Sequence, residues 1–200
     1  MSDCTEALSL LPDTGESPGK QAMSALKGYR LKLKLLVRRG TALCRLGKFM
    51  EAKADYGVAL TMDGQNDALK EDYYQLVLLE KAEESKRLGD ECFQRNELDD
   101  AVTHYSESLR LNPQSIACLS NRAATYLRRH DHQRCIEDCT QALTLLQQAP
   151  GADSEASQRK LTFFAAGPAP GTAKRREWVV KTMVRRGTAF LAMDRLDRGE

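Results

Sequence analysis

Two stretches of this sequence occur twice, and this internal repetition limits the fold more than any other feature. The hexapeptide Val37–Ala42 (Val-Arg-Arg-Gly-Thr-Ala) recurs unchanged as Val184–Ala189, 147 residues later. The segment Asp3–Leu11 recurs with two conservative changes as Asp138–Leu146, 135 residues later. Such repetition predicts a repeat protein, in which each unit buries its apolar face only against its neighbours.

A 34-residue helix–turn–helix unit fits the spacing of the small and aromatic residues. The clearest unit runs from about Ala82 to Ser115. The small residues Gly89 and Ala101 let the two helix backbones approach closely. Phe93 and Tyr105 fill the space between the helices, and Pro113 ends the unit.

Further units fit the same register. The unit at 33–66 has Gly40, Ala52, Tyr56 and Ala59 at the packing positions. The unit at 116–149 has Ala123, Tyr126, Cys135 and Ala142 there. A partial unit beginning near Val180 has Gly187 and Phe190. The sequence therefore predicts an all-α solenoid of helix pairs that winds as a right-handed superhelix.

The repeat register also predicts how the chain is organised. Residues 1–66 form the end of a first array, with a half repeat, a loop at 12–32 and a full repeat at 33–66. Residues 67–81 form a connecting helix, for which Asp67 is the expected N-cap. Residues 82–200 form a second array, with repeats at 82–115 and 116–149, a loop at 150–179 and a partial repeat at 180–200. Because half repeats leave apolar faces unburied, we expect a fragment of a longer array.

Composition argues against several classes of protein. The N-terminus lacks the basic start of a secretory signal, and no window approaches the roughly 18 apolar residues of a membrane span. The six cysteines contain no Cys-x-x-Cys pair, so we expect buried thiols in a cytoplasmic protein. Cys135 and Cys139 have a spacing that could suit a metal, but we expect no metal and no cofactor. The turn His130–His132 is expected to be a polar surface turn, and no catalytic arrangement is found, so we expect no enzyme.

The first helices of the second array carry a selective set of polar residues. Lys86 and Asp90 lie one turn apart, Asn121 lies on the next first helix, and Lys181 and Arg185 lie one turn apart on the third. The first array has a partial equivalent in Lys34 and Arg38. Taken singly, these cations and their neighbours Arg39 and Arg186 could be solvated charges on a helix face. Together they predict a surface that binds an anionic ligand.

These motifs resemble the dicarboxylate clamp of tetratricopeptide-repeat (TPR) co-chaperones. The family pattern is Lys-x-x-Gly-Asn, Asn-Arg-Ala and Lys-x-x-x-Arg, and here the segments are Lys86–Asp90, Asn121–Ala123 and Lys181–Arg185. The resemblance implies a concave groove that binds the C-terminal Glu-Glu-Val-Asp of the seventy- and ninety-kilodalton heat-shock chaperones. Asp90 departs from the family, because an acid replaces the amide donor.

The Val184–Ala189 helix and the long loop before it resemble the dynein-arm assembly factors of the dyslexia-susceptibility-candidate type. The paired arrays are also similar to polymerase-associated and sperm-associated TPR co-chaperones. These resemblances imply a cytoplasmic adaptor protein that acts in axonemal dynein assembly for cilia.

Two alternatives remain open. The groove could bind another peptide without any chaperone. The basic stretches could bind nucleic acid, although the few aromatic residues fall mostly at packing positions and leave no evident stacking platform.

Overall fold

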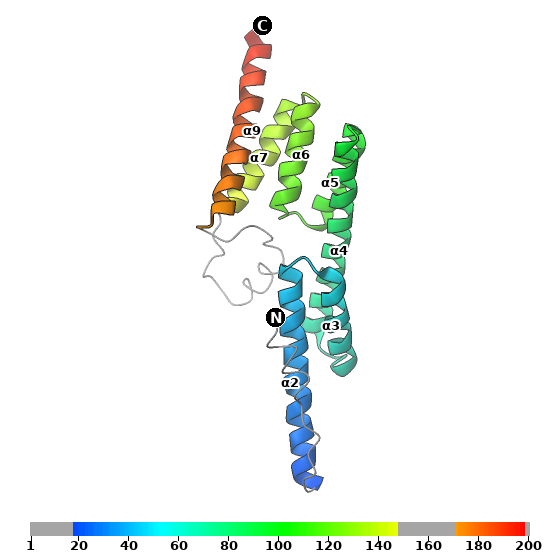
Figure 1. The fold of residues 1–200 in the computed structure, drawn as a ribbon. Helices are drawn as coiled ribbons and strands as arrows, with labels where there is room; N and C mark the ends of the chain where they lie inside the picture. The colour runs from blue at the N-terminus through cyan, green and yellow to red at the C-terminus, as the bar shows by residue number, and fades with distance from the viewer. Residues whose placement is uncertain (1–17, 148–170, 199–200) are drawn as a thin grey trace. The chain divides into compact units, whose positions relative to one another are not determined.

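The structure, a computed structural model, describes residues 18–147 and 171–198. These residues form helices and contain no strand, so the predicted all-α class is confirmed (Figure 1). The helices are α2 (Pro18–Arg45), α3 (Phe49–Met62), α4 (Asp67–Gln94), α5 (Leu98–Leu111), α6 (Ile116–Arg128), α7 (His132–Gln147) and α9 (Ala173–Arg198).

The chain forms two compact units, which comprise residues 1–80 and 81–200. The boundary falls inside α4, so this 28-residue helix contributes to both units. Unit 1 contains the pair α2 and α3. Unit 2 contains the second part of α4, followed by α5, α6, α7 and α9.

The same tight turn connects the two helices of each pair. The residues Gly47, Asn96 and His130 have φ angles of 73°, 63° and 62°. This left-handed conformation favours glycine and tolerates asparagine. The next amide in each turn donates to a carbonyl five residues earlier, which caps the first helix: Lys48 to Leu43 at 3.0 Å, Glu97 to Cys92 at 2.9 Å, and Asp131 to Tyr126 at 2.9 Å.

A glycine on the first helix of a pair packs against a tyrosine on the second. A Cβ atom at Gly40 would lie 2.8 Å from the ring of Tyr56 in unit 1. A Cβ atom at Gly89 would lie 2.8 Å from the ring of Tyr105 in unit 2. The two tyrosines are 0% and 1% exposed, so the packing predicted from the register is confirmed for these two helix pairs. The packing predicted for Phe190 in the partial unit was wrong, because this side chain is 53% exposed.

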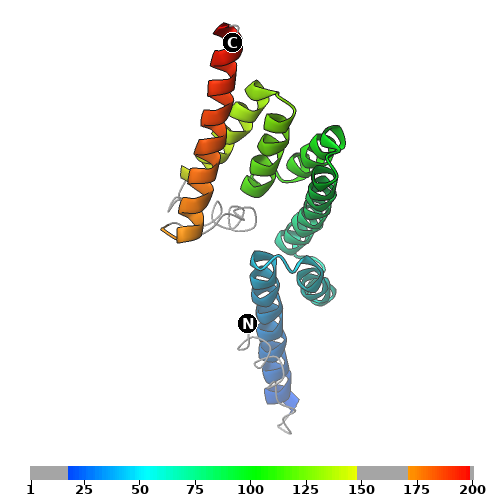
Figure 2. The same ribbon diagram turned by 45° about the horizontal axis from the view of Figure 1, so that its top comes forward.

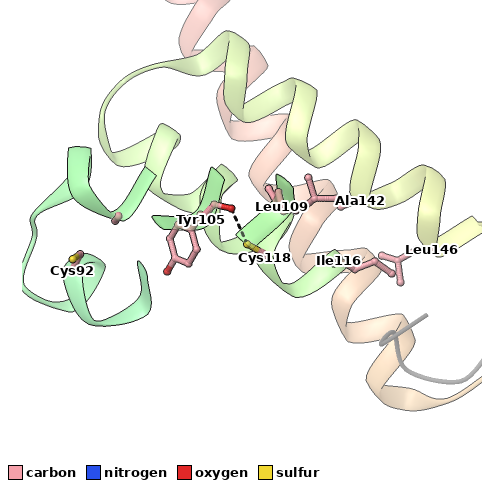
Figure 3. Close-up of a cluster of buried hydrophobic side chains, with 9 residues drawn as sticks. Cys92, Tyr105, Leu109, Ile116, Cys118, Ala142 and Leu146 are labelled. Carbon is pink, nitrogen blue, oxygen red and sulfur yellow. Dashed lines mark hydrogen bonds between the residues drawn. The ribbon is translucent and has the colours of Figure 1, made fainter. Parts of the chain in front are cut away.

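Unit 2 has two apolar clusters. One joins α5, α6 and α7 around Tyr105, Ile116 and Leu146, and Trp178 of α9 packs against it (Figure 3). The other contains Ala123, Cys135, Cys139 and Ala189, all of which are fully buried, together with the mostly buried Tyr126. Helix α9 lies along α7, so Ala189 and Thr182 face the interior of unit 2 (Figures 1 and 2).

The predicted loops were too long. Helix α2 begins at Pro18, so residues 18–32 of the predicted 12–32 loop are helical. Proline is tolerated in the first turn of a helix, and the segment after it contains no further proline. Helix α9 begins at Ala173, so the predicted loop at 150–179 also ended too late. The predicted half repeat before residue 12, residues 12–17 and most of the second loop lie outside the described residues.

The predicted N-cap of the connecting helix was wrong by one residue. Asn66 Oδ1 accepts a hydrogen bond from the Leu69 amide at 3.2 Å, so Asn66 caps α4 and Asp67 lies in its first turn. The connecting helix and the first helix of the next repeat are one continuous helix, since no glycine or proline lies between Asp67 and Leu88.

We expect Gly89→Ala to destabilise unit 2 and Gly187→Ala to leave it as stable or more stable. At position 89 the added methyl would collide with Tyr105. Overpacking of this kind costs about 1–3 kcal/mol, of which the better helix propensity of alanine offsets about 1 kcal/mol. No atom lies within 4 Å of a Cβ placed at Gly187. Urea unfolding followed by far-UV circular dichroism measures both variants, and an unchanged midpoint for Gly89→Ala would contradict the close approach.

Candidate functional site

The structure brings three of the predicted site residues into one hydrogen-bond network. Asp90 on α4 is its centre. Its Oδ1 accepts from the Tyr105 hydroxyl at 2.7 Å and from the Asn121 amide nitrogen at 2.8 Å. Its Oδ2 accepts from Lys86 Nζ at 3.2 Å. Three helices of unit 2, α4, α5 and α6, therefore meet at one carboxylate.

The donors around Asp90 stay protonated at neutral pH. Burial disfavours the charged form of Lys86, but hydrogen bonds and charges from Glu83 and Asp90 outweigh this effect and raise its pKa. Burial also raises the pKa of Tyr105, and the hydrogen bond to Asp90 raises it further. Asp90 is thus the acceptor, while Lys86, Tyr105 and Asn121 are the donors.

The hydrogen bonds to Asp90 occupy donor groups of Lys86 and Asn121. The Lys86 side chain is only 17% exposed, and it also bonds to Glu83 at 2.9 Å. The Asn121 amide donates one of its two N–H groups to Asp90. Both side chains are therefore already bonded to a carboxylate of the protein itself.

Arg185 lies close to this network on α9. Its Nη1 donates to both the carbonyl oxygen and the hydroxyl of Ser120, each at 2.7 Å. Ser120 directly precedes Asn121 on α6, so Arg185 contacts the helix that carries the amide donor. The two bonds also attach α9 to α6 within unit 2.

Lys181 is not joined to the network. It pairs with Glu177 of its own helix at 2.6 Å, and its side chain is 65% exposed. This ion pair holds the pKa of Glu177 below its usual value. Lys34 and Arg38, the partial set of the first array, are exposed on α2 in unit 1. Within the described residues, neither forms an ion pair or a side-chain hydrogen bond.

Sequence reasoning missed the Arg–Asp pairs that link the two helices of a repeat. Arg39 donates to both oxygens of Asp55 at 2.7 and 2.5 Å, and Arg122 donates to both oxygens of Asp138 at 2.8 and 2.7 Å. The interpretation of Arg39 as a solvated charge was therefore wrong. The shared spacing of 16 residues between arginine and aspartate was the signal that could have revealed these pairs.

The described residues give no support for a metal site. Cys135 and Cys139 are fully buried in α7, and no group of three or more metal-binding side chains occurs in the described part of the chain. Cys118 is also buried, which raises the pKa of its thiol to about 11. His130 is exposed in its turn as predicted, but His132 is buried at the start of α7. Among the described helices, none is long and apolar enough to cross a membrane.

Comparison with known proteins gives the repeat type. The TPR repeat family matches residues 89–129, the segment that contains Asp90, Tyr105 and Asn121. This match and the observed helix pairs agree. The chain is an all-α TPR solenoid.

Several proteins resemble this TPR chain over part of their length. Hsp70-Hsp90 organizing protein of Triticum aestivum is 29% identical over 134 residues, which cover 54% of this chain and 22% of that protein. Hsp70-Hsp90 organizing protein 3 of Arabidopsis thaliana is 38% identical over 134 residues, covering 54% and 24%. Heat shock protein sti1 homolog of Schizosaccharomyces pombe is 29% identical over 143 residues, covering 66% and 24%. The matched region is thus about a quarter of each relative.

We expect Tyr105→Phe to destabilise unit 2 by about 1–3 kcal/mol, since a hydrogen bond to a charged group is lost in a buried place. The loss should shrink in an Asp90→Ala background, because the hydroxyl then has no carboxylate to bond. Urea unfolding of the two single variants and the double variant measures this coupling. Tyr74→Phe is the control, as Tyr74 is 57% exposed. Equal effects of Tyr105→Phe in both backgrounds would show that the hydrogen bond to Asp90 contributes nothing.

Proposed function

We propose that this TPR chain is a co-chaperone adaptor whose second array binds the acidic C-terminus of a heat-shock chaperone. The observation that carries the proposal is the position of Lys86, Asn121 and Arg185. They come from α4, α6 and α9, which are successive first helices of unit 2, and hydrogen bonds at Asp90 and Ser120 tie these helices together. The proposed role is binding, without catalysis.

The similar proteins support the class of partner. Two of those described above are named as organizing proteins of Hsp70 and Hsp90. We extend this to chaperones of the seventy- and ninety-kilodalton classes that end in Glu-Glu-Val-Asp. The extension rests on the resemblance of the motifs and on the chemistry of the donors.

The donor chemistry suits a C-terminal aspartate. Such a residue has two carboxylates, its side chain and its chain terminus. A guanidinium and an ammonium form charge-assisted hydrogen bonds with carboxylates, which are about twice as strong as neutral ones. Arg185 and Lys181 supply two cations from one helix, and Lys86 supplies a third. Lys181 is the most accessible of these, because it is exposed and paired only within its own helix.

Asp90 opposes the binding of an anion in this arrangement. Two like charges about 4 Å apart repel by about 1 kcal/mol in water and about 4 kcal/mol near a protein surface. Asp90 also accepts from one of the two N–H donors of Asn121. We therefore propose that the present sequence binds an acidic tail weakly, with a dissociation constant in the micromolar range or above.

The client side of the proposal rests on sequence alone. Because the Val184–Ala189 motif resembles that of dynein-arm assembly factors, we propose axonemal dynein chains as clients and the cytoplasm as the place of action. The names of the relatives support only the chaperone side of this proposal. Co-precipitation of dynein chains from ciliated cells, with and without the Arg185→Ala change, tests the link between the two sides.

We expect Asp90→Asn to strengthen binding of a Glu-Glu-Val-Asp peptide by about fivefold or more, measured by calorimetry. The change removes about 1 kcal/mol or more of repulsion and supplies an amide donor, while its oxygen still accepts from Tyr105. Glu83→Gln is the matched control, because Glu83 also pairs with Lys86 but is 54% exposed. If both changes strengthen binding equally, the surface responds only to net charge and the clamp is not formed.

We expect Arg185→Ala to weaken binding of the same peptide by about 1.5–3 kcal/mol, the range for a hydrogen bond to a charged group. Amidating the C-terminus of the peptide should have a similar effect, since it removes a carboxylate. Arg110→Ala, which removes an exposed cation from α5, should leave binding unchanged. Thermal melting checks that Arg185→Ala keeps α9 in place. No binding by either the parent chain or Asp90→Asn would leave a TPR scaffold for a different peptide as the better function.

A further inference from the structure

The two repeated stretches of the sequence contact each other in unit 2. Val184–Ala189 lies on α9, Asp138–Leu146 lies on α7, and α9 packs along α7 (Figure 1). The first copies of these stretches are Val37–Ala42, on α2, and Asp3–Leu11, which precedes the described residues. The packing of α7 on α9 is therefore a template for the position of Asp3–Leu11 on α2.

One apolar contact of the template involves a leucine that both copies contain. Leu146 of α7 belongs to a buried cluster, and Trp178 of α9 packs against this cluster (Figure 3). Leu11 is the counterpart of Leu146, and Leu31 on α2 stands 147 residues before Trp178. Leu31 is 48% exposed. Helix α2 therefore has an open apolar position where the template places a neighbouring helix.

A second apolar contact has the same two residue types in both copies. Cys139 of α7 and Ala189 of α9 are fully buried in one cluster. Their counterparts in the first copy are Cys4 and Ala42. Small side chains at such a crossing point let two helices approach closely. Together, the two contacts fix one register of the first copy on α2.

A hydrogen bond from an arginine to a hydroxyl connects successive repeats. Arg122 bonds to Asp138 through Nε and Nη2, and its Nη1 donates to the Ser106 hydroxyl of the preceding second helix at 3.0 Å. Arg186 has the same contact with the Thr140 hydroxyl at 3.4 Å. In both cases the hydroxyl lies on the second helix that precedes the arginine.

The first copy contains the residues for the same hydrogen bond. Arg39 bonds to Asp55 through Nε and Nη2, as Arg122 does with its own aspartate. Thr5 is the counterpart of Thr140. A helix that lies on α2 as α7 lies on α9 brings the Thr5 hydroxyl to Nη1 of Arg39.

The length of the connection permits this placement. In unit 2, the carbonyl oxygen of Leu146 accepts from Arg175, which is the counterpart of Gly28 on α2. Leu11 therefore comes to lie beside Gly28, and Pro18 lies about 15 Å from Gly28 along the helix. The chain from Leu11 to Pro18 can span about 23 Å when it is extended, so it can cover this distance.

We propose that Asp3–Leu11 is a helix that packs on α2 as α7 packs on α9. Its contact surface on α2 contains Leu31, Arg39 and Ala42. The occupant of this surface is a segment of the same chain, because both sides of the contact are repeated within the chain. The surface lies in unit 1, so the proposal does not depend on tail binding by unit 2.

Hydrogen exchange of the full chain, measured by mass spectrometry, tests whether Asp3–Leu11 is a packed helix. We expect its amides to be protected, and we expect Leu8→Asp to lower that protection at least tenfold, because the counterpart Leu143 is 4% exposed. Ser9→Asp is the matched control, since it adds the same charge at the next residue and its counterpart Thr144 is exposed. Exchange of the parent segment at the rate of an unfolded peptide would overturn the proposal.

Two leucines of α2 test where the helix packs. Leu31 and Leu26 are 48% and 49% exposed, but they point about 140° apart around the helix axis. We expect Leu31→Ala to lower the protection of Asp3–Leu11 at least fivefold and Leu26→Ala to leave it unchanged. Equal effects of the two changes would refute the proposed placement. Protection that rises with protein concentration, together with a dimer in sedimentation, would assign the segment to α2 of a second copy and would also overturn the proposal.

Discussion

The contact between a first-helix glycine and a second-helix tyrosine sets the spacing on which the other interactions depend. At Gly40 and Gly89 the missing Cβ leaves room for a tyrosine ring that is almost completely buried. Helix pairs held at this distance can place small residues at the remaining crossing points, as Ala52 and Ala101 show with 0% exposure. In the α6–α7 pair, alanine and cysteine occupy the equivalent positions, so close packing is kept with smaller side chains.

The hydroxyl end of the same tyrosine connects the core to the candidate site. In unit 1, Tyr56 meets the hydroxyl of Thr41, and in unit 2, Tyr105 donates to Asp90. Thr41 and Asp90 each follow the packing glycine, so one register position supplies the partner in both units. In unit 2 the residue at this position is an acid, and its partly buried carboxylate also accepts hydrogen bonds from Lys86 and Asn121. The site and the repeat packing are therefore coupled physically.

Charged residues have two different roles in this solenoid. The Arg122–Asp138 pair has side chains that are 19% and 7% exposed, and its bidentate geometry fixes one helix against the next. Removing one partner of such a pair leaves an unpaired charge, which costs several kcal/mol. Exposed pairs such as Arg110–Glu107 contribute little by comparison, because water and salt screen them.

The sequence by itself determined the helix-pair architecture and the packing positions, because both follow from a local period of small and large residues. It also identified Lys86 and Asn121, which both bond to Asp90, and Arg185, which bonds to Ser120 beside Asn121. Only the tertiary structure decided the partners of the polar residues, such as the hydrogen bonds of Asp90 and the pairing of Arg39 with Asp55. Those depend on which side chains meet across different helices, and repeat spacing does not specify them. The starts of α2 and α9 were likewise missed. The start of α2 contains proline and two glycines, which are typical of loops, and α9 has little amphipathic periodicity to mark it as a helix.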